Sequence, residues 1–205
     1  MAARFITLEG GEGAGKTTQA RRLADALAAR GRPVLLTREP GGAPGAEAIR
    51  GLLVGGETAR WTPLAETMLV FAARAEHVAR TIRPALAAGM WVVCDRYVDS
   101  TTAYQGSGQG VGDPSVRALR DLIGLDPDVT LILDVEEGAG LARAAMRGAA
   151  DRYERMGASF HARVRAAFRR IAAEEPRRCI LLDAAGAPED VHARIVDALA
   201  TRLAL

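Results

Sequence analysis

The chain has 205 residues, of which 49% are hydrophobic and 25% are charged, so we expect one globular domain over residues 1–205 and no extensive disorder. Its formal net charge of +2 is too small to indicate a general nucleic-acid or membrane binder. The longest apolar run, residues 85–94, is too short to span a bilayer, and the opening residues lack the apolar core of a secretory signal. Cys94 and Cys179 lie in apolar runs and are predicted to be buried thiols of a cytoplasmic protein.

Short apolar runs alternate with amphipathic segments along the chain. In order, the pattern predicts a strand at 4–9, a helix at 16–30, a strand at 33–37, a short helix at 46–54 and a long helix at 63–88, whose end Pro84 should kink or interrupt. It continues with a strand at 91–94, a helical turn near 101–105, a helix at 114–123, a strand at 129–134, helices at 137–147 and 157–174, a strand at 179–182 and a helix at 188–203. Such a chain is typical of an α/β fold, a doubly wound five-stranded parallel sheet with helices on both faces. The scattered His77, His161 and His192 are predicted to be surface residues.

A glycine-rich loop joins the first strand to the first helix and fits the pattern GxxxxGK[ST]. In this motif, backbone N–H groups and the helix N-terminus surround phosphate oxygens, the lysine reaches the β- and γ-phosphates, and the hydroxyl group ligates Mg²⁺. The candidate ATP-binding residues are Gly10, Gly11, Glu12, Gly13, Ala14, Gly15, Lys16, Thr17 and Thr18. Lys16 is the only lysine of the chain, which supports a functional role. The motif alone does not separate kinases from GTPases or motor ATPases.

Charged residues follow two further strands, at the edge of the sheet where open α/β folds bind ligands. Asp95 and Arg96 end the strand at 91–94, Arg38 follows the strand at 33–37, and Arg50 lies on the next helix. We expect Asp95 to organise Mg²⁺ or the attacking oxygen. A phosphomonoester carries nearly two charges, so the convergence of Arg38, Arg50 and Arg96 predicts a site for an acceptor phosphate.

Several arginines gather between residues 143 and 155, around a glycine. Such a segment is typical of a mobile lid that closes on ATP and brings a guanidinium to the transferring phosphoryl group. Gly13 offers no charge from the cradle, so the donor has to come from elsewhere. Arg147 and Arg152 are the candidate donors, Arg143 is a third, and the sequence does not decide among them.

Six segments resemble bacterial thymidylate kinases in their order and spacing, over nearly the whole chain. They are LEGGEGAGKTT (8–18), TREPGG (37–42), FAARAEH (71–77), DRYVDSTTAYQG (95–106), PDVTLILDV (127–135) and ARAAMRGAADRYE (142–154). The resemblance implies a homodimer of P-loop kinase subunits that uses ATP and Mg²⁺ to phosphorylate dTMP. It also implies the variant of the family whose catalytic arginines lie in the lid.

The resemblance further implies roles for single residues. Arg38, Arg50 and Arg96 would bind the dTMP phosphate, and Glu12 would lie near the sugar hydroxyl and the metal, where Thr17 and Asp95 are the candidate ligands. Arg74, Thr101 and Gln105 would read the base, Tyr104 would lie against C2′ of the sugar, and Arg143 would lie against adenine. The catalytic set implied in this way is Glu12, Lys16, Asp95, Arg96, Arg147 and Arg152.

One position departs from the family pattern. Many members place a base-stacking phenylalanine four residues before the arginine that stands at position 74, where this chain has Val70. Phe71 lies three residues before Arg74, and both offsets lead to the same helix face. We therefore expect Phe71 to stack on the base.

Other functions remain open at this point. Another nucleoside-monophosphate kinase or a deoxynucleoside kinase would share the cradle, although a deoxynucleoside acceptor would not need three arginines for a phosphate. A non-kinase ATP-binding assembly factor is possible only if the arginine-rich segment and TREPGG are incidental. A GTPase normally reads guanine through an NKxD motif, which a chain without asparagine cannot contain.

Overall fold

A computed structural model describes residues 3–146 and 151–203 of the chain. Its centre is a sheet of five parallel strands in the order β2-β3-β1-β4-β5, so the predicted sheet is confirmed. The strands are β1 (Phe5–Gly10), β2 (Val34–Arg38), β3 (Trp91–Asp95), β4 (Val129–Asp134) and β5 (Cys179–Asp183). The chain runs from β1 to the edge strand β2, returns to β3 beside β1, and then continues on the other side of β1 with β4 and β5, so the carboxyl end of β1 lies at the switch point where such folds bind ligands.

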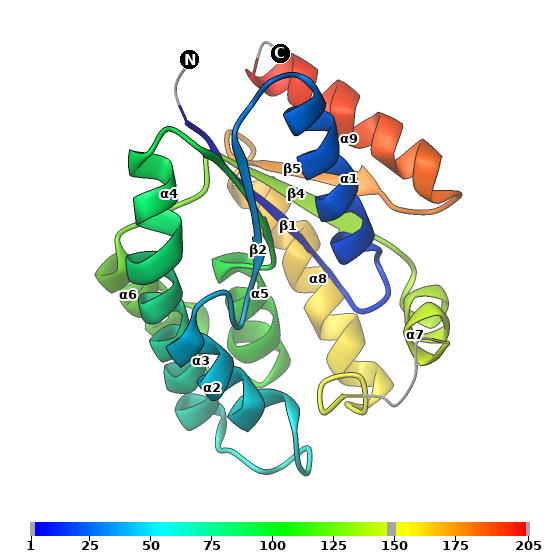
Figure 1. Ribbon diagram of the computed structural model, residues 1–205. Helices are drawn as coiled ribbons and strands as arrows, with labels where there is room; N and C mark the ends of the chain where they lie inside the picture. Colours follow the sequence, from blue (N-terminus) through cyan, green and yellow to red (C-terminus); the bar gives the residue numbers. More distant parts are fainter. Residues whose placement is uncertain (1–2, 147–150, 204–205) are drawn as a thin grey trace.

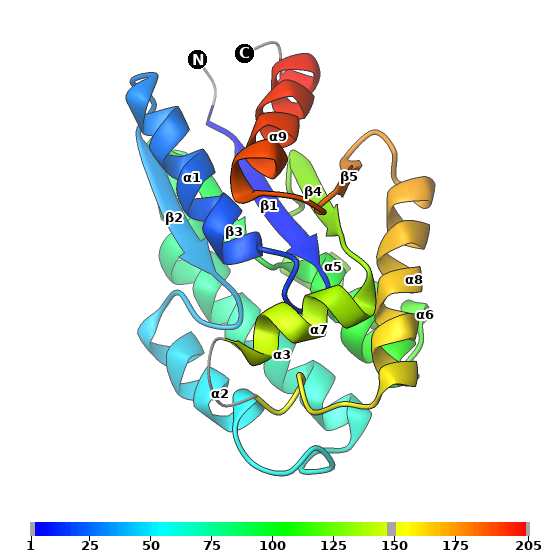
Figure 2. The same cartoon turned by 90° about the vertical axis from the view of Figure 1, so that its right-hand side faces the viewer.

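Helices cover both faces of this sheet (Figures 1 and 2). On one face, α1 (Lys16–Ala29) and α9 (Pro188–Leu203) pack against Ile6 and Leu8 of β1. On the other face, Phe5 and Val92 pack with residues from α3 (Pro63–His77) and α6 (Asp113–Ile123), and Ile132 packs with α8 (Ala158–Glu174). Successive strand side chains point to opposite faces, which explains why each strand reads as a continuous apolar run.

The long helix predicted at 63–88 is interrupted near Pro84, one of the two outcomes expected there. After α3, a π-helical segment (Val78–Ile82) leads into α4 (Arg83–Ala87), which contains Pro84. Proline has no N–H to donate one turn back, so the preceding turn cannot remain a regular α-helical turn. The helical path therefore continues past the proline, with the irregular turn just before it.

The remaining elements surround the carboxyl ends of the strands. They are α2 (Pro44–Val54), α5 (Val98–Thr101) with a second π-helical segment (Thr102–Gly108), and α7 (Glu137–Ala145). The helical turn predicted near 101–105 is thus confirmed and extended. Figure 2 shows α7 crossing the carboxyl end of β1.

The prediction of surface histidines is wrong for two of the three. His77 and His161 are buried, and only His192 is partly exposed. His77 lies on the inner face of α3, where its Nδ1 lies 3.0 Å from Glu39 Oε1 and its Nε2 lies 2.7 Å from Thr37 Oγ1. Cys94 and Cys179 are buried free thiols, as expected. Among the described residues, no helix is both long and apolar enough to cross a membrane.

Candidate active site

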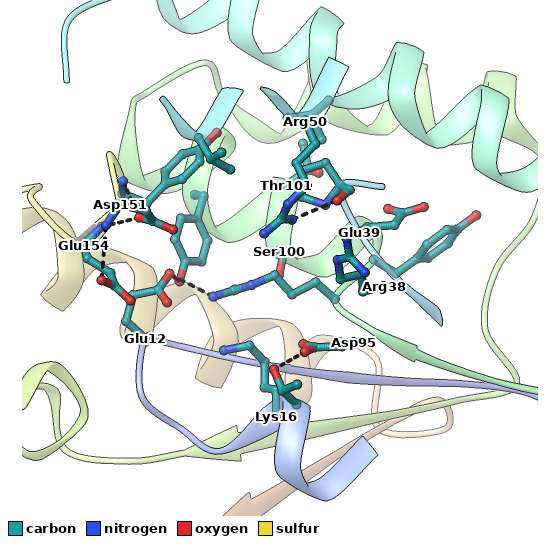
Figure 3. A pocket seen from close by; sticks show the side chains of 18 of the residues that line it. Glu12, Lys16, Arg38, Glu39, Arg50, Asp95, Ser100, Thr101, Asp151 and Glu154 are labelled. Atoms are coloured by element: carbon teal, nitrogen blue, oxygen red, sulfur yellow. Dashed lines mark hydrogen bonds and ion pairs between the residues drawn. The ribbon is translucent and has the colours of Figure 1, made fainter. Parts of the chain in front are cut away.

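A cavity of about 250 Å³ opens at the carboxyl ends of β1, β2 and β3 (Figure 3). The pairing of Leu8 and Arg38 with Asp95 in the sheet brings these strand ends together. The lining residues comprise cradle residues, the predicted arginines and several carboxylates: Glu12, Gly13, Gly15, Lys16, Thr17, Arg38, Glu39, Pro40, Arg50, Val54, Val70, Arg74, Asp95, Arg96, Tyr97, Ser100, Thr101, Tyr104, Gln105, Asp151, Tyr153 and Glu154. Nearly all of the predicted substrate residues therefore share one space.

The cradle has the geometry that a phosphate site requires. Gly15 stands in the left-handed region immediately before α1, so the helix N-terminus points its free N–H groups at the cavity. Lys16 is buried and its Nζ donates to the carbonyl of Gly11 at 2.6 Å. Burial and the Arg96 charge lower the pKa of Lys16 to about 8, and a phosphate ligand would oppose that shift by favouring the charged ammonium.

Gly13 is fixed by a close approach of α7. Its φ is +65°, and a Cβ built there would lie 1.8 Å from the carbonyl oxygen of Gly140. No side chain fits at this position, so the cradle itself contributes no charged group there.

Thr17 and Asp95 form an oxygen pair on the floor of the cavity. The Thr17 hydroxyl donates to Asp95 Oδ2 at 2.5 Å. The described residues contain no cluster of three metal-ligating His, Cys, Asp or Glu side chains. Two protein oxygens beside a phosphate cradle suit Mg²⁺, which keeps several waters and is held largely by substrate phosphates.

Glu12, Arg96 and Tyr104 form a charged group next to the cradle. Arg96 donates to Glu12 at 2.8 Å, the Tyr104 hydroxyl donates to the same Glu12 oxygen at 2.6 Å, and the guanidinium lies over the Tyr104 ring. Burial alone would raise the pKa of Glu12, but the charges of Arg96 and Lys16 outweigh it and lower the pKa to about 2. Glu12 is therefore a fixed negative charge that holds both neighbours in place.

Arg38 and Arg50 face this group across the cavity (Figure 3). One terminal nitrogen of Arg38 donates to both carboxylate oxygens of Glu47, at 2.9 and 3.0 Å, and Arg50 donates to the carbonyl of Pro40 at 2.8 Å. Burial and the charge of Arg38 lower the pKa of Arg50. Closely spaced positive charges of this kind are stabilised by an anion, and the phosphate-binding role of these arginines stays a prediction.

Arg74 extends from α3 to the cavity and forms a buried ion pair there. Its Nε donates to Glu39 at 2.8 Å and one terminal nitrogen donates to the Thr101 hydroxyl at 3.0 Å. The other terminal nitrogen, NH1, is buried without a hydrogen-bond partner among the described residues. Since buried donors are normally paired, this nitrogen is suited to a ligand atom.

The expectation that Phe71 stacks on the base is corrected by the structure. Val70 lines the cavity, whereas Phe71 is buried in the core with Phe5 and Tyr97, and its ring lies 4.7 Å from the Arg74 guanidinium. Residues three and four before Arg74 lie on the same helix face. The ring of the residue three before Arg74 nevertheless packs into the core, on the side of Arg74 away from the cavity.

The arginine-rich segment is only partly described. Arg143 does not line the cavity and donates to the carbonyl of Ala184 at 3.3 Å, and Arg147 lies outside the described residues. Arg152 is fully buried, outside the cavity lining, and its donors bind the carbonyls of Leu53 and Thr58 and the carboxylate of Glu66. A catalytic role for Arg152 would require all three contacts to be released, and that role stays a prediction.

Sequence reasoning missed the buried acids Glu39 and Glu66. Both read as ordinary surface charges in isolation. A signal was present, because Glu66, Val70, Arg74 and His77 recur at helical spacing on one face, and the apolar neighbours indicate that this face is buried.

The cradle residues and the arginines predicted to bind the acceptor phosphate line one cavity. A fold and a site of this kind define a P-loop phosphotransferase that acts between two phosphorylated compounds. The thymidylate kinase family profile matches residues 8–195 of this chain. A thymidylate kinase of Rhizorhabdus wittichii is 55% identical over 99% of this chain and 100% of its own length, and one of Caulobacter vibrioides is 52% identical over 98% of each.

Structural comparison agrees with the sequence matches. The crystal structure of thymidylate kinase from Ehrlichia chaffeensis has a TM-score of 0.81 and 34% identity, covering 97% of this chain and all of its own. The chain belongs to the thymidylate kinase family.

Proposed function

We propose that this chain transfers the γ-phosphate of ATP to dTMP, giving ADP and dTDP. Family membership supports the reaction. The observation that carries the acceptor assignment is that Arg38, Arg50 and Arg96 line the same cavity as Arg74, which has one nitrogen without a hydrogen-bond partner among the described residues. A nucleoside monophosphate would offer its dianion to the three arginines and its base to Arg74.

The chemistry needs positioning and charge more than covalent catalysis. An oxygen of the acceptor phosphate attacks the γ-phosphorus, a new P–O bond forms, and the bond from that phosphorus to the β–γ bridging oxygen breaks, leaving its electron pair on ADP. Arg96 orients the attacking phosphate, while Lys16 and the N-terminus of α1 stabilise the charge of the donor phosphates.

Thr17 and Asp95 would hold Mg²⁺ in this reaction. The ion would supply charge neutralisation for the phosphates. The hydrogen bond between the two side chains keeps both oxygens on the same side of the cradle.

Base recognition is proposed from Arg74 and Gln105, which line the same cavity. The free nitrogen of Arg74 is a donor suited to thymine O4, and Gln105 is near enough to the same space to meet N3–H. Cytosine presents an amine and an unprotonated N3 at these positions. A site built for hydrogen bonds discriminates strongly against a mismatched partner, because its own buried groups are left unpaired.

Tyr104 is proposed to select the deoxy sugar. Its ring is buried and its hydroxyl is fixed on Glu12, so the ring edge cannot move away from a 2′-hydroxyl group. Trimming Tyr104 to Ala is expected to reduce the preference for dTMP over its ribonucleotide counterpart.

The experiment that tests the function is an ADP-release assay with ATP, Mg²⁺ and a panel of nucleoside monophosphates. We expect dTMP to be the best acceptor, dUMP to follow because only a methyl contact is lost, and dCMP, dAMP and dGMP to be poor. If a purine nucleotide or dCMP were the best acceptor, the assignment to dTMP would be wrong and the protein would be a different nucleotide kinase.

A homodimer is proposed from the outer face of α3. Leu64 and Met68 are half-exposed there and are followed by exposed Ala72, Ala75 and Ala79 at helical spacing. A second copy of this chain would cover that apolar stripe, which solvent disfavours. The cytoplasmic location expected from the sequence stays a prediction.

A further inference from the structure

Glu66 is a buried carboxylate at which three side chains meet. It is fully buried on α3, and its Oε1 accepts from Nε2 of Gln105 at 2.8 Å and from Nε2 of Gln109 at 2.7 Å. Its other oxygen accepts from Arg152. A carboxylate in this position joins a residue of the acceptor cavity to the segment that follows residue 150.

The chemistry of a carboxylate fixes which way the Gln105 amide points. An ionised carboxylate only accepts hydrogen bonds, so the nitrogen of the amide must face Glu66. The hydrogen bonds of the Gln105 side chain to described residues all use Nε2, at Glu66 and at the Tyr153 hydroxyl. Its oxygen is thereby left to accept from a ligand in the cavity that Gln105 lines.

Arg152 maintains this arrangement. Its guanidinium is fully buried against Glu66 and donates to the carboxylate oxygen that Gln105 and Gln109 do not use. Arg152 is itself held at the connection between α2 and α3, where Nε donates to the carbonyl of Leu53 at 2.8 Å and NH1 to that of Thr58 at 2.9 Å. An amide in place of this carboxylate would be able to donate to the Gln105 oxygen and turn the Gln105 amide around.

We propose that Glu66 is a positioning residue for base selection, which holds the Gln105 amide with its oxygen toward the base, and that Arg152 holds the Glu66 carboxylate in place through its other oxygen. The inference rests on the proposed function, since it assumes that the base of the acceptor occupies this end of the cavity. An oxygen at this point accepts from N3–H of thymine and meets an unpaired acceptor at N3 of cytosine. An amide free to turn would serve both bases.

The test compares acceptors within each variant. The ratio of kcat/KM for dTMP to kcat/KM for dCMP is measured for the unmutated protein and for Glu66→Gln. We expect the ratio to fall by about tenfold or more in Glu66→Gln, through a lower value for dTMP and an equal or higher value for dCMP, with the KM of ATP within about twofold. A merely structural role would lower both acceptors alike and leave the ratio unchanged.

A second variant keeps the test usable if Glu66→Gln fails to fold, which is a risk because that change leaves the buried Arg152 without its charged partner. The double variant Glu66→Leu with Arg152→Met removes both charges, and apolar replacement of a buried ion pair is often neutral for stability. It also leaves Gln105 without its anchor, so the same fall in the ratio is expected. The matched control is Asp99→Asn, which disrupts another buried ion pair, with Arg178 at 2.7 Å, and should leave the ratio unchanged.

The outcomes separate this inference from the proposed function. If the unmutated protein prefers dTMP and a folded Glu66 variant keeps the ratio within about twofold, the role of Glu66 is wrong and the function stands. If Asp99→Asn lowers the ratio as much as Glu66→Gln does, the effect is not specific to Glu66 and the inference is also wrong. If the unmutated protein does not use dTMP, the proposed function itself fails.

The result also decides what Arg152 does. Loss of a guanidinium that acts on the transferring phosphoryl group would slow dTMP and dCMP by the same factor. A changed ratio in the single variant Arg152→Met, which keeps Glu66, would therefore assign Arg152 to the positioning of Glu66. An unchanged ratio with a uniform rate loss would return it to the phosphoryl group and overturn the proposal.

Discussion

At the scale of the single residue, the site depends on a few side chains held by fixed partners. Lys16 is the clearest case, because its Nζ spans the cradle to the Gly11 carbonyl and its exposed fraction is only 6%. Glu12 and Arg96 form a second fixed pair, and Arg74 with Glu39 a third. Each pair turns one charged group toward the cavity.

Lys16→Ala tests the cradle. Loss of its ammonium group removes a charge-assisted contact to the donor phosphates and stabilisation of the transition state, so turnover should fall by about 10²-fold or more. Arg21→Ala, on the exposed surface of the same helix, is the control and should retain normal turnover. Steady-state kinetics beside circular dichroism gives the answer, and a folded Lys16→Ala protein with near-normal turnover would remove the assignment.

Glu9 gives the structure a testable pH dependence. It is buried beneath the cradle, where it accepts from the Tyr97 amide at 2.8 Å and the Ser100 hydroxyl at 2.5 Å. Burial and the Asp99 charge raise the pKa of Glu9 from 4.5 to about 7. The folded protein then binds this proton more tightly than the unfolded chain, so the contribution of Glu9 to stability is full below pH 4.5 and is lost as the pH rises toward 7.

Glu9→Gln should remove that dependence. Between pH 5 and 8, the free energy of unfolding measured in urea should fall as the pH rises in the unmutated protein. In Glu9→Gln this fall should be smaller by on the order of 3 kcal/mol. Glu57→Gln, at an exposed carboxylate, is the control and should follow the unmutated curve. Identical pH profiles for all three proteins would show that Glu9 does not titrate in this range.

Sequence could predict site residues that lie in local motifs, and it failed where packing decides. The cradle, Asp95, Arg96 and Arg38 were found because each follows a strand end, and parallel strand ends meet at one edge. Phe71 was placed wrongly because residues three and four before Arg74 share a face, and only tertiary packing separates them. Glu39 and Glu66 were missed because a buried charge is recognised by its partner, which lies far away in the chain.

At the scale of the element, α7 and the cradle form one unit. Gly140 and Gly13 approach so closely that neither has room for a side chain, since a Cβ at Gly140 would lie 2.4 Å from the Glu12 carbonyl oxygen. The strands were predictable because parallel strands buried on both faces are continuously apolar. The two π-helical segments were not, because they reflect how helical turns adjust to Pro84 and to the packing around Tyr104.

Gly13→Ala tests the contact between the cradle and α7. The added methyl group would push α7 away and disturb the phosphate site, so we expect a lower thermal midpoint and a higher KM for ATP. Gly89→Ala is the matched control, because Gly89 has φ +77° but open space around its Cβ position. Both variants carry the left-handed backbone cost of about 1 kcal/mol, and the excess loss in Gly13→Ala measures the clash. Equal losses in the two variants would contradict the contact.

At the scale of the whole molecule, the sheet and its helices bring two phosphate sites into one cavity and leave one apolar helix face uncovered. The exposed fractions of Leu64 and Met68 on α3 are 50% and 55%. If a second copy covers this face, Met68→Glu should convert a dimer into a monomer at micromolar concentration, as measured by sedimentation velocity. Leu181→Glu, on the edge strand β5, is the control and should leave the assembly unchanged. A monomeric unmutated protein would contradict the proposed homodimer.

The central claim is direct transfer between two nucleotides bound in this cavity. It is tested by incubating the protein with ATP labelled in its γ-phosphate, Mg²⁺ and dTMP, and then separating the nucleotides. We expect the label to appear in the β-phosphate of dTDP, one for each ADP formed, and Lys16→Ala to lower both products together by about 10²-fold or more. Release of the label as free phosphate, or ADP formation that does not depend on dTMP, would contradict it.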